Sequence, residues 1–433
     1  MDELLLNPIE RVFSATMSPP GSKSLTNRAL VLSALAAGPC ELSNVLFSDD
    51  TLVMLECLGR LGFFPKIDRQ NKTVGIQGRS GAIPSGSAEL FCGNSGTTIR
   101  FLAALCALGR GTYTLDGIPR MRQRPIGPLV ELLRNLGARV EYVMEEGFPP
   151  VRVLADTLPG GRCRFGASTS SQFLSAILQV APYTRHETRI DLDPNQTSWP
   201  YVAMTMRLMD EFHHTPELIR DPKTSEPRQI IISQGAYGPT HYAVEPDASN
   251  ATYFLAIAAI HPDSSVTISG LGKNSLQGDV GFANLLRQMG ADVQLKADSI
   301  TATGTDILEG IEADMSSMPD TAQTLAVVAL FAEGPTTLRG IHTLRVKETD
   351  RVAALASELQ KLGAKVDVEG DDLTIHPPEK VLPASIATYD DHRMAMSFAI
   401  AGSKSPGIRI QDPACVNKTY PNFFDDLKKL QSA

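Results

Sequence analysis

The sequence predicts an α/β protein (α+β in the detail of its units) built from six copies of one unit, in which strands alternate with two kinds of helix. Six apolar runs of 12 to 15 residues recur along the chain at intervals of 71 to 79 residues. A second run, with charges between its Leu residues, follows each apolar run, and short strand-like runs lie between the two. Self-similarity at a fixed period indicates a repeat architecture.

The six apolar runs predict helices that are buried on all sides. Each run is rich in small apolar residues and nearly uncharged, which is typical of a helix without an exposed face. Ser, Asp or Gly begins each run, and these residues cap helix starts. The runs cover residues 24–38, 96–109, 170–182, 249–260, 320–334 and 391–402.

The charged runs that follow predict amphipathic helices with one exposed face. They cover residues 55–62, 129–137, 208–213, 285–290, 355–363 and 424–430. Strand-like runs cover residues 112–115, 229–232, 265–268, 366–368 and 407–410. The unit is therefore β-α-β-α-β-β, about 75 residues long. One unit cannot cover its own buried helix, so the six units share cores in a ring, a solenoid or two lobes of three.

Composition excludes several classes of protein. Forty Lys and Arg against 48 Asp and Glu give a net charge of −8, which disfavours a general nucleic-acid binder. No apolar run approaches the roughly 18 residues of a membrane span, and the first residues fit neither a signal peptide nor a transit peptide. The six Cys lack the spacing of zinc ligands or redox pairs and are expected to be buried thiols in a reducing cytoplasm.

Motifs for common cofactors are absent from the sequence. There is no G-x-x-x-x-G-K-[ST] or G-x-G-x-x-G loop, so nucleotide binding has no support. There is no H-E-x-x-H motif and no cluster of Cys and His, so no metal site is indicated. We therefore expect no cofactor and no metal.

Cations gather at the starts of the buried helices. Lys23, Arg28, Arg100 and Arg393 lie at three such starts, and Gly96 would let a ligand approach the backbone of one of them. Helix N-termini bind phosphate and carboxylate groups. The alternative for each single start is a cap that needs no ligand. Several cationic starts in register with the repeat favour an anion site.

Two further segments are dense in charge. Residues 120–126 contain three Arg, and residues 345–351 alternate in sign at the expected start of an amphipathic helix. There Lys347 and Arg351 would be neighbours on one helix face, with Glu348 beside Arg351. The alternative is a solvated charged segment. A mixed cluster of acids and bases could instead bind an anion and move a proton, which predicts an enzyme for small polyanions without a cofactor.

Four segments resemble motifs of the 5-enolpyruvylshikimate-3-phosphate synthase family, and the resemblance runs from about residue 17 to the C-terminus. It implies two lobes of three βαβαββ units each, an inside-out α/β barrel, with a hinge between the lobes. Residues 1–20 and 240–433 would form the lobe with both termini, and residues 21–239 the other. The segments are P-G-S-K-S-L-T-N-R at 20–28, G-N-S-G-T-T-I-R at 93–100, R-V-K-E-T-D-R at 345–351 and D-H-R-M-A-M at 391–396.

The resemblance also implies a reaction, in which the enolpyruvyl group of phosphoenolpyruvate moves to the 5-hydroxyl of 3-phosphoshikimate and phosphate is released. Asp320 would be the base, Glu348 the acid, and Lys23 a further catalytic residue. Contacts to 3-phosphoshikimate would come from Lys23, Ser24, Arg28, Ser170, Ser171, Gln172, Ser198, Tyr201, Asp320 and Lys347. Contacts to phosphoenolpyruvate would come from Lys23, Asn94, Gly96, Arg124, Gln172, Arg351, Arg393 and Lys418.

Two positions depart from the family pattern. Thr343 stands where members often have Asn, which puts one substrate contact in question. Phe101 stands where many members have Pro, directly after Arg100. We expect Phe101 to reshape the helix behind Gly96 and to change the response to the family's inhibitor glyphosate, in a direction that the sequence leaves open.

Three other functions compete with this one. A sister enolpyruvyl transferase acts on UDP-N-acetylglucosamine and usually carries a Cys in the loop that corresponds to residues 118–125, where this chain has none. A non-catalytic repeat protein that binds phosphorylated metabolites would not need Asp320, Glu348 or Lys23, all of which are present. A nucleic-acid end-processing enzyme is disfavoured by the acidity. No apolar stripe suggests an interface, so we expect a cytoplasmic monomer with two small-molecule substrates.

Overall fold

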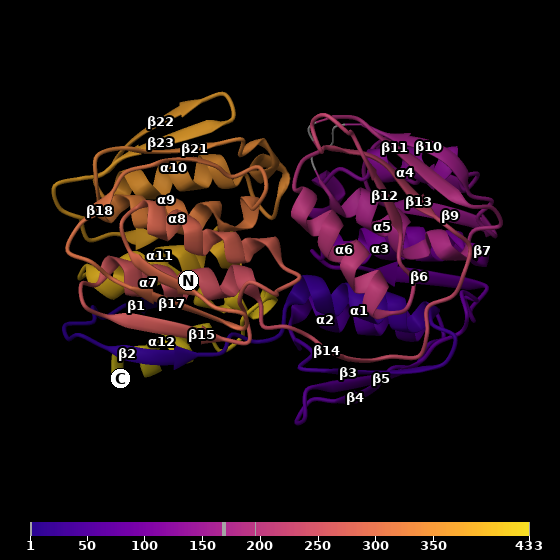
Figure 1. Ribbon diagram of the computed structural model, residues 1–433, viewed down its shortest axis with the longest axis horizontal. Helices are drawn as coiled ribbons and strands as arrows, with labels where there is room; N and C mark the ends of the chain where they lie inside the picture. Colours follow the sequence, from indigo (N-terminus) through magenta and orange to yellow (C-terminus); the bar gives the residue numbers. More distant parts are fainter. Residues whose placement is uncertain (1, 167–169, 195, 433) are drawn as a thin grey trace. The chain divides into compact units, whose positions relative to one another are not determined.

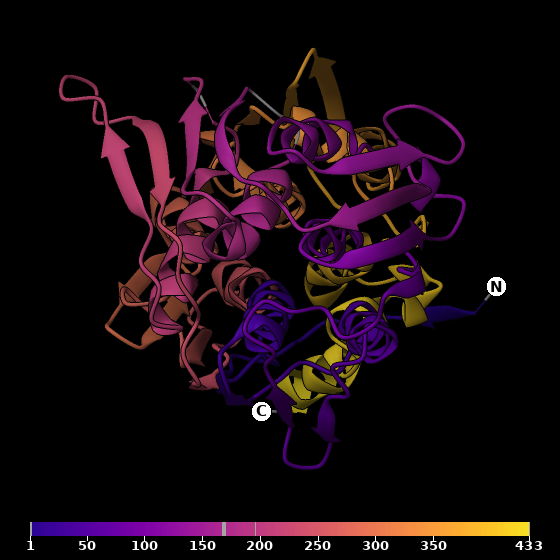
Figure 2. The ribbon, with the colours of Figure 1, turned by 90° about the vertical axis from the view of Figure 1, so that its right-hand side faces the viewer.

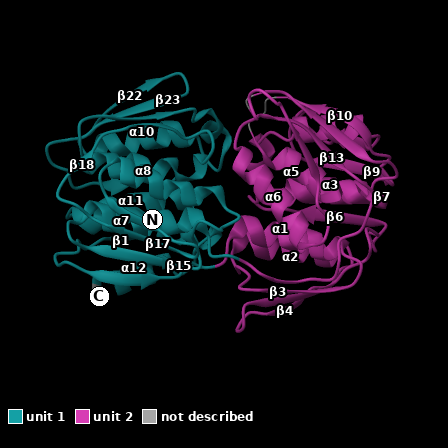
Figure 3. Cartoon of the chain, viewed as in Figure 1, with its two compact units in different colours: residues 1–20, 245–433 teal, residues 21–244 magenta. Residues whose placement is uncertain are grey.

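The structure, a computed structural model, describes residues 2–166, 170–194 and 196–432 (Figure 1). Contacts divide the chain into two compact units (Figure 3). Unit 1 consists of residues 1–20 and 245–433, and unit 2 consists of residues 21–244. The chain passes from unit 1 to unit 2 after Pro20 and returns after Val244.

Unit 2 contains three four-stranded sheets, one for each of three repeats. Across each sheet, the first two strands lie parallel to each other, and the third strand lies antiparallel to the strands on both of its sides. The elements are α1 (Lys23–Leu35), β3 (Pro39–Ser43), α2 (Asp49–Arg60), β4 (Lys66–Asp68), β5 (Thr73–Gln77), β6 (Ser87–Phe91), α3 (Gly96–Ala107), β7 (Arg110–Asp116), α4 (Gly127–Asn135), β8 (Arg139–Tyr142), β9 (Val151–Asp156), β10 (Gly161–Phe165), α5 (Gln172–Val180), β11 (Thr188–Leu192), α6 (Trp199–Glu211), β12 (Glu217–Arg220), β13 (Pro227–Ile232) and β14 (His241–Ala243).

Unit 1 repeats this arrangement in two four-stranded sheets and one three-stranded sheet, with a short extra strand pair, β18 with β20. Its elements are β1 (Glu3–Leu5), β2 (Ser14–Met17), α7 (Ala248–Ile260), β15 (Ser265–Ser269), α8 (Phe282–Gln288), β16 (Asp292–Leu295), β17 (Ser299–Thr303), β18 (Leu308–Glu309), β19 (Glu312–Asp314), α9 (Ala322–Val328), β20 (Ala332–Glu333), β21 (Thr336–Arg339), α10 (Arg351–Lys361), β22 (Lys365–Glu369), β23 (Asp372–His376), β24 (Ser385–Ile386), α11 (His392–Lys404), β25 (Arg409–Gln411) and α12 (Phe423–Ser432).

Short 3-10 helices join several of these elements. In the described residues they are η1 (Met121–Gln123), η2 (Ala181–Tyr183), η3 (Gly278–Gly281), η4 (Pro319–Thr321), η5 (Ala329–Phe331), η6 (His342–Val346) and η7 (Pro413–Lys418).

Three strands complete sheets whose other strands lie far away in the sequence. β14 lies parallel to β3, with His241 opposite Glu41, and so supplies the first strand of the first repeat. β2 lies parallel to β15, with Ser14 opposite Ser265. β1 lies antiparallel to β25 in the last repeat. In each unit, the strand that completes a sheet, β14 or β2, therefore lies next to a point where the chain passes between the units.

The buried helices predicted from the sequence are confirmed in all six repeats. Every residue of α3 and of α7 is buried. In unit 2, α1, α3 and α5 pack on one another, and in unit 1, α7, α9 and α11 do the same. The strands of unit 2 lie outside its helices (Figure 2). The predicted fold class, with three βαβαββ repeats in each lobe and helices inside the sheets, is therefore correct, and no sheet of the described strands closes into a barrel.

The thiols and the helix lengths agree with the composition. The six Cys are free thiols; five are buried, and Cys415 is half-buried. Burial raises the pKa of the Cys163 thiol to about 12, which keeps it protonated. Among the described helices, none has both the length and the apolar character that crossing a bilayer requires.

We expect the free energy of unfolding to fall as the pH drops below about 6.5, in part because of His261. Burial lowers the pKa of His261, whose Nδ1 and Nε2 lie 2.7 and 3.0 Å from the carbonyl oxygens of Ile257 and Ser403. The unfolded chain therefore takes up this proton at a higher pH than the folded chain. Urea unfolding at pH 7.5 and 5.5 should show a smaller loss in His261→Gln than in the unmodified protein. The exposed His186 provides the control, His186→Gln, and equal losses in all three proteins would contradict the assignment.

Candidate active site

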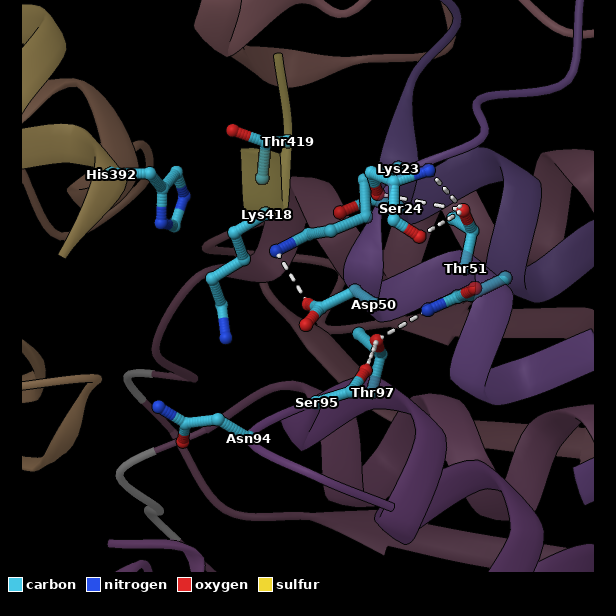
Figure 4. A network of polar contacts seen from close by, with 12 residues as sticks. Lys23, Ser24, Asp50, Thr51, Asn94, Ser95, Thr97, His392, Lys418 and Thr419 are labelled. Carbon is cyan, nitrogen blue, oxygen red and sulfur yellow. Dashed lines mark hydrogen bonds and ion pairs between the residues drawn. The ribbon is translucent and has the colours of Figure 1, made fainter. Parts of the chain in front are cut away.

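The first polar cluster of unit 2 lies at the start of α1. The side chain of Ser22 caps this helix by accepting a hydrogen bond from the backbone N–H of Leu25, so α1 begins at Lys23. Lys23 points toward α2, where its Nζ lies 3.2 Å from Oδ2 of Asp50 (Figure 4). The two side chains are 13% and 5% exposed. Asp50 therefore holds the ammonium group of Lys23, a predicted site residue, in a position with little contact with water.

Arg28, on the same helix, is buried and joins three helices of unit 2. Its exposed fraction is 1%. Nε donates to Oγ1 of Thr205 at 2.7 Å, and Nη1 donates to the carbonyl of Ser24 at 3.0 Å. Nη2 donates to Oγ of Ser175 at 3.2 Å and to the carbonyl of Tyr201 at 3.4 Å. The structure thus brings three predicted residues together, Ser24, Arg28 and Tyr201.

A second cluster lies at the start of α3. Ser95 caps the helix, which begins at Gly96. Nη1 of Arg124 donates to the backbone carbonyl and to Oδ1 of Asn94, at 2.9 and 3.3 Å. A Cβ added to Gly96 would lie 2.7 Å from Nη2 of Arg124. The missing side chain of Gly96 therefore makes room for the guanidinium of Arg124.

Arg100 connects this cluster to α5. Its Nη1 donates to Oε1 of Gln172 at 2.6 Å, and its Nη2 donates to the carbonyl of Pro125 at 3.0 Å. Its guanidinium carbon lies 4.9 Å from the centre of the Phe173 ring. Because Arg100 occupies the amide oxygen of Gln172, the amide N–H groups of Gln172 are oriented away from it and can donate to an anion.

The predicted serines lie at helix starts. Oγ of Ser170 accepts a hydrogen bond from the backbone N–H of Gln172 at 3.3 Å. Ser171 and Ser198 occupy the N-cap positions of α5 and α6. Ser198 has a φ of 55°, in the left-handed region, a conformation that clusters at functional sites. Residues 167–169, just before Ser170, lie outside the described residues.

In unit 1 the predicted residues meet around Asp320, in η4. Its Oδ1 lies 3.4 Å from Nζ of Lys347 and 3.4 Å from Nη1 of Arg351. Its Oδ2 accepts a hydrogen bond from Nη2 of Arg393 at 2.9 Å. The side chain of Asp320 is 21% exposed, more than that of any of its three cationic neighbours. It is therefore a carboxylate within reach of a ligand.

Arg351 is the centre of this cluster and is 1% exposed. Its Nε lies 2.7 Å from Oδ2 of Asp391, and its Nη2 lies 3.0 Å from Oε2 of Glu348. Burial alone would lower the pKa of Arg351, but the nearby Asp391, Glu348 and Asp320 carboxylates outweigh burial and raise it. Arg351 is therefore permanently charged and holds three carboxylates in fixed positions.

The remaining predicted cations of unit 1 lie beside the same carboxylates. Nζ of Lys418, in η7, lies 3.8 Å from Oε1 of Glu348. Nη1 of Arg393 lies 3.4 Å from the hydroxyl of Tyr253, whose pKa burial raises to about 12. Unit 1 thus places four cations around three carboxylates, a mixture that can bind an anion and move a proton.

One prediction about this segment was wrong. Lys347 and Arg351 do not share a helix face, because residues 342–346 form η6 and α10 begins only at Arg351. Asp350 caps α10 by accepting hydrogen bonds from the backbone N–H groups of Val352 and Ala353. Lys347 and Arg351 meet instead through Oδ1 of Asp320. The predicted contact between Glu348 and Arg351 is present.

The two departures from the family pattern lie in buried positions. Thr343, in η6, is 1% exposed, and its hydroxyl has no hydrogen-bond partner among the described residues. Phe101 lies inside α3, which is a regular helix from its first residue. The ring of Phe101 lies against the guanidinium of Arg28.

Several supporting residues were missed by the reasoning from sequence. Asp50 lies in a run of acids at a helix start, a pattern that could have been related to the nearby cations. Ser175 and Thr205 are polar residues inside buried helices, and nothing local connects them to Arg28. Asp391 belongs to a recognised motif, but its role as the partner of Arg351 depends on the fold. Among the described residues, no group of three or more His, Cys, Asp or Glu could hold a metal ion.

The chain is similar to known proteins over nearly its whole length. The family model of EPSP synthase (3-phosphoshikimate 1-carboxyvinyltransferase) matches residues 7–427. A 3-phosphoshikimate 1-carboxyvinyltransferase from Nostoc sp. is 42% identical over 431 residues, which are 99% of this chain and 100% of the relative. One from Shewanella halifaxensis is 43% identical over 433 residues, with coverage of 99% and 100%.

Solved structures give the same result for the fold. An EPSP synthase from Acinetobacter baumannii matches with a TM-score of 0.81 at 26% identity, over 99% of this chain and 98% of that one. The enolpyruvyl transferase NikO from Streptomyces tendae matches with a TM-score of 0.79 at 19% identity, over 99% and 97% of the two chains, and shares the fold. By its sequence and its structure, the chain belongs to the EPSP synthase (3-phosphoshikimate 1-carboxyvinyltransferase) family.

Proposed function

We propose that this chain, a transferase of that family, moves the enolpyruvyl group of phosphoenolpyruvate to the 5-hydroxyl of 3-phosphoshikimate and releases phosphate. The reaction belongs to the shikimate pathway of aromatic amino-acid biosynthesis. The observation that carries the proposal is that one buried guanidinium, that of Arg351, contacts two carboxylates. Its Nη1 lies beside Asp320, and its Nη2 lies beside Glu348. The sister reaction on UDP-N-acetylglucosamine has no support from the full-length relatives.

The two carboxylates would carry the proton transfers. Glu348 gives a proton to the methylene carbon of phosphoenolpyruvate, which makes the neighbouring carbon electrophilic. The 5-hydroxyl oxygen of 3-phosphoshikimate adds to that carbon while Asp320 takes the hydroxyl proton, and a tetrahedral intermediate forms. The Glu348 carboxylate would then take back a proton from the new methyl group while the C–O bond to phosphate breaks, which restores the double bond. The proton that Asp320 holds would pass to the departing phosphate, so both side chains return to their starting states. Positioned acids and bases of this kind contribute about 10²- to 10⁴-fold each.

The cations would bind the anionic groups of both substrates. We assign phosphoenolpyruvate to Lys23, Asn94, Gly96, Arg124, Gln172, Arg351, Arg393 and Lys418. We assign 3-phosphoshikimate to Lys23, Ser24, Arg28, Ser170, Ser171, Gln172, Ser198, Tyr201, Asp320 and Lys347. Support comes from the clustering of these residues within each unit and from the burial of their charges, which strengthens their attraction for phosphate and carboxylate. Arg351, Arg124 and Arg28 are each less than 5% exposed.

We expect Gly96→Ala to raise the KM for phosphoenolpyruvate by about 10- to 100-fold. The added Cβ would lie 2.7 Å from Nη2 of Arg124, so this guanidinium must shift. A hydrogen bond to a charged group contributes about 1.5–3 kcal/mol, which corresponds to that range. The control is Gly59→Ala, because a Cβ on Gly59 meets nothing within 4 Å. An unchanged KM for phosphoenolpyruvate in Gly96→Ala would contradict the role of Arg124.

Phosphate release tests the function itself. The protein is mixed with phosphoenolpyruvate and 3-phosphoshikimate, and each substrate is omitted in turn. Release that requires both supports the proposal. Release with UDP-N-acetylglucosamine in place of 3-phosphoshikimate would favour the sister reaction. Binding of both substrates without release would favour a non-catalytic protein that binds phosphorylated metabolites.

We also propose that the chain acts as a monomer in the cytoplasm. The six free thiols support a reducing compartment. Sedimentation equilibrium should give the mass of one chain, 46.7 kDa. A mass of twice that value would contradict the monomer.

A further inference from the structure

Arg28 is a buried cation that is held by neutral groups. A guanidinium has five N–H groups, and four hydrogen bonds reach hydroxyl or backbone carbonyl oxygens, none of them a carboxylate. Within the described part of the chain, this leaves one N–H group of Nη1 for another acceptor. Burial lowers the pKa of Arg28 to about 9, which reflects how costly this charge is without an anion. The position therefore favours an anionic ligand.

The ring of Phe101 lies beside this guanidinium and presents its face to the cation. The guanidinium carbon of Arg28 lies 5.1 Å from the centre of the Phe101 ring, and Phe101 is fully buried. A cation within about 6 Å of an aromatic face is attracted by the ring, and the attraction is stronger when both groups are dehydrated. The hydrogen bonds direct the N–H groups of Arg28, whereas the ring adds an attraction that holds the guanidinium carbon above its face.

Phe101 lies on a different face of α3 from the residues that are close to Arg124. Successive residues of a helix are turned by about 100°. Gly96 and Arg100, four residues apart, therefore lie on nearly the same face, and both are close to Arg124 or its neighbour Pro125. Phe101 is turned away from that face and lies against Arg28. A change at Phe101 should therefore act on Arg28 more than on Arg124.

We infer that Phe101 is a positioning residue for 3-phosphoshikimate, whose ring holds the Arg28 guanidinium in the position in which its remaining N–H group meets an anionic group of that substrate. The inference rests on the proposed function, since it assumes that Arg28 binds 3-phosphoshikimate. It gives a function to Phe101, which departs from the family pattern. Proline, common at this position in the family, has no aromatic face and so could not hold a guanidinium in this way.

The first test compares Phe101→Leu with the unmodified protein. We expect the Kd for 3-phosphoshikimate, measured by isothermal titration calorimetry, to rise about 5- to 30-fold, because tenfold corresponds to about 1.4 kcal/mol. The KM for phosphoenolpyruvate and kcat should change less than about twofold. The matched control is Phe212→Leu, since Phe212 is also fully buried in unit 2 but packs on Tyr237 and Tyr242. Equal losses for both substrates, or an unchanged Kd, would overturn the inference.

A second variant separates ring electrostatics from packing. Pentafluorophenylalanine at position 101 keeps the shape of the ring but reverses the sign of its face potential. We expect it to weaken 3-phosphoshikimate binding at least as much as Phe101→Leu, even if the Leu variant folds poorly. Undiminished affinity in this protein would show that Phe101 only fills space. Failure of the proposed function would appear earlier, as an unmodified protein that neither binds 3-phosphoshikimate nor releases phosphate.

Discussion

Asp320→Asn should lower kcat for phosphate release by about 10²- to 10⁴-fold, the range for loss of a positioned general base. The amide cannot accept the proton of the attacking hydroxyl, but it retains the shape of the carboxylate. It also removes a negative charge that lies beside Lys347, Arg351 and Arg393. Binding of the anionic substrates should therefore be kept or strengthened while turnover is lost.

Steady-state kinetics measures the loss of turnover, and calorimetry measures whether substrate binding is kept. Asp298→Asn is the matched control, because Asp298 is an exposed carboxylate of the same unit in the turn between β16 and β17. A fall in substrate affinity with kcat unchanged would show that Asp320 binds substrate without acting as the base. Glu348→Gln provides the parallel test of the acid and should lower kcat over the same range.

Arg351→Met should lower the free energy of unfolding of unit 1 by about 3–5 kcal/mol, the range for breaking a buried ion pair from one side. The Arg351 and Asp391 side chains are 1% and 0% exposed, so Asp391 would be left as a buried charge without its main partner. The double variant Arg351→Met/Asp391→Leu should recover part of the loss, because an apolar pair of similar volume needs no desolvation of charge. The exposed pair of Arg345 and Asp350 provides the control Arg345→Met, with an expected loss of at most about 1 kcal/mol.

The two units allow this loss to be located. The single Trp of the chain, Trp199, begins α6 in unit 2, so its fluorescence reports the unfolding of that unit. Circular dichroism reports both units. Urea unfolding of Arg351→Met should shift the dichroism transition more than the fluorescence transition. The opposite order would place the damage in unit 2 and contradict the assignment.

The helices could be predicted because their signals are local. A nearly uncharged apolar run of 12 to 15 residues is buried on all sides, and a Ser or Asp at its start can cap it, as Ser22, Ser95 and Asp391 do. The start of α10 was placed too early because alternating charges over residues 345–351 look like helix pairs. Asp350 sets the start of α10, because its side chain accepts hydrogen bonds from the first N–H groups of the helix.

The candidate site could be predicted only in part. Motif resemblance identifies Arg28 and Arg351, but their partners come from distant parts of the chain. Thr205 and Ser175 are 177 and 147 residues away from Arg28, and Asp391 is 40 residues away from Arg351. The sequence suggested that Phe101 would reshape α3. Only the packed structure shows that the helix is regular and that the ring lies beside the guanidinium of Arg28.

The strands that close the units also set the order in which the chain can fold. Unit 2 is one continuous stretch that is complete once β14 has been synthesised. β1 and β2 leave the ribosome before unit 2, but their partners β25 and β15 come after it. At about 5–20 residues per second, β1 waits roughly 20 to 80 s for Arg409–Gln411. We therefore expect a state during synthesis in which unit 2 is formed while β1 and β2 are unpaired, and in which a chaperone could cover those exposed strands.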